Sequence, residues 1–174
     1  MEQLKTAFGR GSPEGGIYDI FKSEHRQVKA SLAEIINSGR AMKDIFAQTV
    51  AALELHMKAE ETLFYPKLDR NSNTRMMALK AQEEHNLARL VINDINSAPA
   101  DEKWIVKTQI LNDILNRHID VEENDIFPTA RKAISENEAM QLGRDYRTQT
   151  VSQTPNSQNA SPAPKTDEPA VVYP

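Results

Sequence analysis

The sequence predicts an all-α protein: an antiparallel up-down-up-down four-helix bundle with a short fifth helix and a disordered tail at its C-terminus. Three observations support this prediction. Residues 1–150 hold only four of the nine Pro residues, which is too few breakers for a sandwich or barrel of many short strands. Apolar residues recur every three or four positions through long segments, as on the buried face of a helix. Short polar turns join these segments, and short connections favour antiparallel neighbours.

Two helices are expected in the first half of the chain, after a flexible lead-in over residues 1–16 that is rich in Gly. The first helix runs from about Ile17 to Ser38, with Gly39 as its C-cap. The second runs from about Arg40 to Pro66, and a polar turn follows it at residues 69–73. The apolar core candidates of these two helices are Phe21, Val28, Leu32, Ile35, Ile45, Val50, Leu53, Met57, Leu63 and Phe64.

Two more long helices and a short one are expected in the second half. The third helix runs from about Thr74 to Asn96, and Asp101 is the predicted N-cap of the fourth, which reaches Pro128. Ser135 and Glu138 have the spacing of a capping box for a short last helix that ends at about Tyr146.

The last 24 residues, 151–174, differ from the rest of the chain. Ser, Thr, Asn, Gln and five of the nine Pro residues dominate them, and they offer almost nothing to bury. We therefore expect a disordered tail, which serves either as a solvated extension or as a docking segment for a protein partner. The bundle, residues 17–150, is then one domain between the lead-in and the tail.

Composition excludes several classes of function. The net charge of −4 gives no electrostatic reason to expect nucleic acid as a partner. The absence of Cys excludes disulfides, a thiolate nucleophile, an iron–sulfur cluster and a Cys-ligated zinc site. The chain has no apolar run long enough to span a membrane and no signal-peptide core at its start, so we expect a cytoplasmic protein.

An internal repeat contains all four His residues. Residues 55–66 and 117–128 share one pattern: a His, three residues, two Glu, and a Pro ten positions after the His. The lone His25 and His85, each preceded by Glu, form a weaker pair 60 residues apart. The chain therefore reads as two similar helical hairpins, each with a lone His and a His-x-x-x-Glu segment.

The spacing predicts that these side chains meet. Residues four apart share a helix face, so His56 can point the same way as Glu60, and His118 the same way as Glu122. Counted from the turns, all four His fall at one height, about 20 Å from each turn at 1.5 Å per residue. The predicted metal ligands are His25, His56, Glu60, His85, His118 and Glu122.

Six such ligands fit two metal ions better than one structural zinc ion, which needs four. A lone His is more often an ordinary core or surface residue than a ligand. However, burying four imidazoles and two carboxylates without a metal would cost several kcal/mol. Imidazole and carboxylate without sulfur suit iron, zinc or manganese. Ferritin-like di-iron proteins are a poor match, because they place Glu three residues before His, not four after it.

The arrangement His25, His56-x-x-x-Glu60, His85, His118-x-x-x-Glu122, over residues 17–130, resembles the hemerythrin-like, or HHE, cation-binding domain. The resemblance implies a non-haem di-iron centre: two Fe ions bridged by both carboxylates and by an oxo or hydroxo ligand. It also implies that His25 and His56 share one iron, and that His85 and His118 share the other. The repeat further predicts that the two irons are nearly equivalent.

One position departs from the oxygen-carrying hemerythrins, which have a fifth His one turn after the third. That turn holds Arg89 here, and the related position on the first helix holds Lys29; neither cation can ligate. The more open centre favours binding or reduction of a small oxidant (oxygen, peroxide or nitric oxide), as in an oxidative-stress protein. The alternative is an iron- or oxygen-sensing, or iron-storing, module without turnover. Whether Arg89 faces the metals or the solvent is left open.

Three further residues have expected roles outside the ligand set. Glu61 and Glu123 follow the ligand carboxylates at about 140° from the His of their own helix, so we expect solvated charges there. Tyr18 lies two turns before His25, where it either packs at the bundle end or donates a hydrogen bond near the site.

Overall fold

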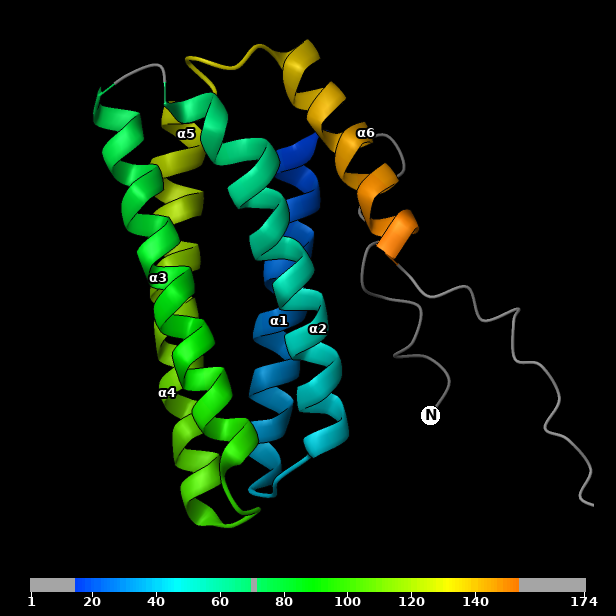
Figure 1. Cartoon of the computed structure of the whole chain (residues 1–174), viewed down its shortest axis with the longest axis vertical. Helices are drawn as coiled ribbons and strands as arrows, with labels where there is room; N and C mark the ends of the chain where they lie inside the picture. The colour runs from blue at the N-terminus through cyan, green and yellow to red at the C-terminus, as the bar shows by residue number, and fades with distance from the viewer. Residues whose placement is uncertain (1–14, 70–71, 154–174) are drawn as a thin grey trace, which may run out of the picture.

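The computed structural model confirms the all-α prediction. It describes residues 15–69 and 72–153, and every regular element in these ranges is helical. The four long helices run up-down-up-down (Figure 1), and α1 contacts α2 and α4 while α3 packs on α4. These helices are α1 (Ile17–Ser38), α2 (Lys43–Ala59), α3 (Ser72–Ser97) and α4 (Glu102–Val121).

The predicted lead-in and tail fall mostly outside this description, which omits residues 1–14 and 154–174. Among the helices it does contain, none has the combination of length and apolar character that a membrane span requires.

Three predicted helix caps are confirmed. Gly39 has a positive φ of 63° and closes α1 as a left-handed C-cap, a conformation that favours Gly. The Asp101 carboxylate accepts the backbone N–H groups of Lys103 and Trp104 at the start of α4. Ser135 and Glu138 form the reciprocal capping box, because the Glu138 carboxylate accepts the Ser135 N–H at 3.1 Å and the Ser135 hydroxyl accepts the Glu138 N–H at 3.3 Å.

The second and fourth helices differ from the single runs that the sequence predicts. α2 widens into the π-helical turn η2 (Glu60–Phe64) and continues as the 3₁₀ turn η3 (Tyr65–Leu68). α4 likewise widens into η4 (Glu122–Ile126), which the short helix α5 (Phe127–Ala130) follows.

Proline accounts for the position of both wide turns. Pro66 and Pro128 have no N–H to donate, so the regular hydrogen-bond pattern is interrupted there. The residue before each Pro donates its N–H five positions back instead, to the carbonyl of Glu60 or of Glu122. Both wide turns therefore begin at a predicted ligand carboxylate.

The last helix, α6 (Glu136–Gln153), is longer than the short segment that the sequence predicts, and it continues three residues past position 150. It packs along α1, outside the four-helix bundle (Figure 1). The approach is close at Gly143, where an added Cβ would lie 3.1 Å from the Gly15 carbonyl oxygen and 3.2 Å from the Ile17 nitrogen. Arg147 donates to the same Gly15 oxygen at 2.6 Å.

The apolar core consists of two clusters with a polar layer between them. One cluster lies at the end of the bundle that carries the π turns and α6, and includes Ile17, Phe21, Phe64, Leu68, Ile126, Phe127 and Leu142. The other occupies the opposite end and includes Val28, Leu32, Ile35, Phe46, Leu53, Met57, Trp104, Leu111 and Leu115. On α1 and α3, the His lies about one helical turn from a member of each cluster. The polar layer is therefore packed between apolar side chains on both sides along the bundle axis.

The contact at Gly143 gives a prediction about α6. Ala is about 1 kcal/mol more favourable than Gly inside a free helix. In the folded protein, however, Gly143→Ala places a methyl group against the backbone at Gly15 and Ile17, which must move. We expect a net loss of about 1–3 kcal/mol, measured by urea unfolding, with faster amide hydrogen exchange confined to α6. A variant more stable than the parent would contradict the observed packing.

Candidate metal centre

The four imidazoles meet between the two apolar clusters. Each His is at most 4% exposed. The Nε2 atoms of His25 and His56 lie 3.1 Å apart, and those of His85 and His118 lie 3.0 Å apart. The chain thus brings together two His pairs, each with one member from a lone-His helix and one from a His-x-x-x-Glu helix.

The two predicted carboxylates lie between these pairs, and both are fully buried. Glu60 reaches both pairs, with Oε1 3.2 Å from His56 Nε2 and Oε2 3.3 Å from His85 Nε2. Glu122 uses one oxygen for both, since its Oε2 lies 3.2 Å from His25 Nε2 and 3.6 Å from His118 Nε2. All six predicted ligands therefore gather in one place.

Each imidazole also contacts a second carboxylate with its outer nitrogen. Because a carboxylate only accepts hydrogen bonds, Nδ1 carries the proton in the neutral imidazole and Nε2 keeps its lone pair for the centre. The four contacts from Nδ1 are His25 to Glu123 at 2.8 Å, His56 to Glu24 at 2.8 Å, His85 to Glu61 at 2.9 Å and His118 to Glu84 at 3.1 Å.

The expectation that Glu61 and Glu123 are merely solvated charges was therefore wrong. It considered each helix alone, whereas a side chain at about 140° from its own His faces the neighbouring helix of the bundle. Glu61 thus meets His85 of α3, and Glu123 meets His25 of α1. Two sequence signals could have revealed this layer: the doubled Glu in both repeats, and the Glu before each lone His.

Two tyrosines that the sequence analysis missed extend this network. The Tyr65 hydroxyl donates to Glu122 Oε1 at 2.6 Å, whereas the equivalent position of the second repeat holds Phe127. The Tyr146 hydroxyl, on α6, donates to Glu24, whose other oxygen contacts His56. Tyr146 lies outside the repeat, so no pattern in the sequence linked it to the centre.

Arg89 does not reach the fifth-ligand position. Its guanidinium contacts Glu61 at 2.9 Å and Glu54 at 3.0 Å. Glu61 lies at the Nδ1 side of His85, so Arg89 stands behind the imidazole rather than beside Nε2. Lys29, its counterpart on α1, pairs with Asp120 at 3.1 Å near the surface.

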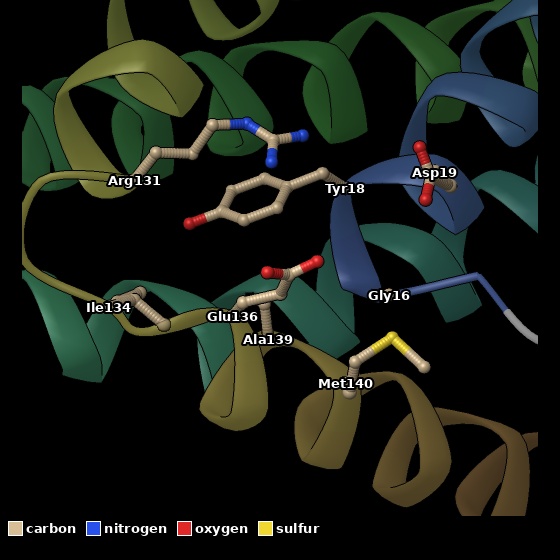
Figure 2. A pocket seen from close by; sticks show the side chains of 8 residues that line it. All are labelled: Gly16, Tyr18, Asp19, Arg131, Ile134, Glu136, Ala139 and Met140. Carbon is tan, nitrogen blue, oxygen red and sulfur yellow. The ribbon is translucent and has the colours of Figure 1, made fainter.

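Tyr18 packs at the bundle end and takes no part in the His cluster. Its ring contacts Phe64 and Phe127, and the Arg131 guanidinium lies 4.1 Å from the ring centroid. The ring lines a hollow of about 280 Å³ between the start of α1, the α5–α6 connection and α6. Figure 2 shows the Tyr18 ring between the side chains of Arg131 and Glu136. Its buried hydroxyl has no hydrogen-bond partner among the described residues.

The carboxylates change the proton affinity of the cluster. Burial opposes the charged form of His85, but the neighbouring carboxylates of Glu60 and Glu61 raise its pKa from 6.5 to about 9. Burial likewise opposes ionisation of Glu60, yet His56 and His85 hold the pKa of its carboxyl well below the ordinary value. Without a metal, the His85 imidazole therefore holds its proton at neutral pH beside an ionised Glu60.

The donor set fits metal ions. Both oxygens of Glu60 and Oε2 of Glu122 are buried and have no hydrogen-bond donor within the described ranges. They face the four Nε2 atoms, which approach one another in two pairs, an arrangement that protons or metal cations stabilise and that is costly otherwise. Two groups have ligand atoms within 4.8 Å of one another: His25, His56, Glu60 and Glu122, and Glu60, His85 and His118.

Comparison with known proteins agrees with this geometry. The family described as the hemerythrin HHE cation binding domain matches residues 16–130, which include all six side chains. The chain belongs to this family. The resemblance inferred from the His and Glu spacing is confirmed, and the hemerythrin-like domain carries a His/Glu cluster that is able to hold metal.

Individual relatives of this hemerythrin-like chain are distant. An uncharacterized hemerythrin-like protein of Schizosaccharomyces pombe is 28% identical over 75% of this chain and 66% of its own length. An uncharacterized protein of Mycobacterium tuberculosis is 26% identical over 72% of this chain and 80% of its own. A protein of Nostoc named DNA nickase is 21% identical over 80% of this chain, which spans only 40% of that protein. No solved structure matches.

The tyrosine network gives a prediction about the metal-free protein. Tyr65→Phe removes the donor to buried Glu122 and should lower the free energy of unfolding by about 1–3 kcal/mol. Tyr18→Phe is the matched control, since its buried hydroxyl has no described partner and its loss should change stability by less than about 0.5 kcal/mol. Urea unfolding measures both; equal effects would contradict the role of the Tyr65 hydrogen bond.

Proposed function

We propose that the six inner side chains bind two metal ions, one at His25 and His56 and the other at His85 and His118, with both carboxylates shared. The observation that supports this most is the convergence of the Nε2 atoms, at 3.1 Å in one pair and 3.0 Å in the other. Glu60 supports two positions rather than one, because its two oxygens lie against different pairs.

We propose further that both ions are iron and that the centre binds or reduces a small oxidant such as oxygen, peroxide or nitric oxide. Nitrogen and oxygen ligands without sulfur are compatible with iron. Two bound ferrous ions would supply one electron each, becoming ferric, and an external reductant would be needed to return them to the ferrous state. Each position has two imidazoles and shared carboxylates, and Arg89 turns away from His85 Nε2, so its side chain would not compete with a small ligand for the metal.

The surrounding residues would serve this chemistry in two ways. Buried aromatic rings keep bulk water from one side of the centre. Phe21 packs against His56, with 5.0 Å between the ring centroids, and Phe64 and Phe127 are also buried there. Tyr65 holds a proton on its hydroxyl at Glu122, and its pKa is raised well above the ordinary value by burial and by the Glu122 and Glu60 carboxylates. That hydroxyl stays protonated and can continue to donate.

The test is anaerobic loading with Fe²⁺, elemental analysis, and then exposure to oxygen or peroxide. Two irons per chain are expected, followed by consumption of the oxidant and a new near-ultraviolet absorption band. His118→Ala should lower the iron content and the reaction, whereas Asp120→Asn, at the exposed Lys29 pair, should not. One iron or none in the parent would contradict the two-ion proposal, and two inert irons would contradict the oxidant chemistry.

A pH dependence of metal affinity follows from the raised pKa values. His85 carries a proton below about pH 9 in the metal-free cluster, and a metal ion must displace it. Affinity should therefore rise with pH from 6.5 towards 9. Calorimetry in buffers of different ionisation enthalpy should show proton release on binding; an affinity that is constant over this range would contradict the ligand role of the imidazoles.

A second candidate function, an iron or oxygen sensor without turnover, is favoured by the contact between α6 and the centre. Tyr146 joins α6 to His56 through Glu24, so metal binding that fixes the ring would also fix α6. Limited proteolysis with and without iron tests this function. Selective protection of α6 by iron supports it, and equal cleavage in both states excludes it.

A further inference from the structure

The charges behind the two His pairs differ, although the repeat relates them. Arg89 donates to Glu61 Oε1 at 2.9 Å, and this is the same oxygen that the His85 Nδ1 contacts at 2.9 Å. On the related side, Glu123 Oε1 contacts only the His25 Nδ1 among the described hydrogen bonds. Lys29, the counterpart of Arg89, is engaged by Asp120 instead.

The carboxylates behind the second imidazole of each pair, Glu84 and Glu24, accept no hydrogen bond from a cation among the described contacts. Glu84, behind His118, has the Arg117 guanidinium 4.0 Å from its Oε1. Glu24, behind His56, accepts a hydrogen bond from the neutral Tyr146 hydroxyl. Lys22 and Lys29 act on Glu123 only through space, as Lys80 and Arg117 act on Glu84, so the cationic hydrogen bond described behind a His pair is the one from Arg89 to Glu61.

This difference affects metal binding in two ways. A carboxylate oxygen that also accepts a hydrogen bond from a guanidinium is a weaker acceptor for the imidazole N–H. The imidazole is then less basic at Nε2, so it binds a metal ion less tightly. The guanidinium also repels a cation in the centre directly. Both effects weaken binding at the His85–His118 position.

We propose that Arg89 makes the two metal positions unequal, so that the His85–His118 position binds its divalent ion more weakly and fills second. The proposal rests on the two-ion function above. Arg89 acts through Glu61 and is therefore a positioning residue, not a ligand. The near-equivalence that the repeat predicts would then hold for the ligands but not for the affinities.

The experiment is a stepwise titration of the metal-free protein with Co²⁺, followed by calorimetry and visible absorption. The parent should show two steps whose affinities differ by about tenfold or more. Arg89→Met should tighten the second step alone, and reduce the difference to about threefold or less. Arg89→Gln, which keeps a donor to Glu61 but loses the charge, should behave like Arg89→Met, whereas Arg89→Lys should retain most of the difference.

Lys29→Met is the matched control, because Lys29 occupies the related position on α1 without a hydrogen bond to Glu123. It should leave both steps within about twofold of the parent. Far-ultraviolet circular dichroism of each metal-free variant shows whether it is folded, and Arg89→Gln decides the matter if Arg89→Met does not fold.

The outcomes separate this proposal from the function on which it rests. Two equal steps in the parent would overturn the inequality but leave the two-ion centre intact. A second step that weakens or stays unchanged in both Arg89→Met and Arg89→Gln would overturn the role of Arg89, since it would then only hold Glu61 in place. No Co²⁺ binding by the parent would contradict the two-ion function itself.

Discussion

The centre depends on one interaction, repeated four times: an imidazole N–H directed at a carboxylate. This contact sets the protonated nitrogen of each His outward and turns its Nε2 lone pair inward. The Nε2 atoms then lie about 3 Å from one another in pairs, an arrangement that is unfavourable unless protons or cations lie between them. The helices must therefore supply outer carboxylates and inner ligands at the same height.

Two features of the fold meet this constraint: the π turns and the two apolar clusters. The π turns at the ends of α2 and α4 begin at Glu60 and Glu122, where the chain needs one Glu facing inward and the next facing a neighbouring helix. The apolar clusters above and below confine the polar layer, so the side chains within it have few other partners. Wide helical turns occur often at functional sites, and here both lie directly at the cluster.

The sequence was sufficient for the bundle and for the six inner side chains, because both depend on periodicity along single helices. Helix caps such as Asp101 follow from residue type, and the common height of the four His follows from the number of residues between each His and the nearest turn. Contacts between neighbouring helices could not be predicted in this way, because Glu61 and Glu123 reach across to other helices and Arg89 turns to Glu61. Tyr146 was beyond prediction because nothing local fixes where α6 docks.

The central claim is that the two His pairs hold two metal ions in the hemerythrin-like bundle. The most direct measurement is a crystal structure of the iron-loaded protein with anomalous diffraction at the iron edge. The account predicts two anomalous peaks, one against Nε2 of His25 and His56 and one against Nε2 of His85 and His118, with Glu60 touching both. A single peak, or peaks away from these nitrogens, would contradict it.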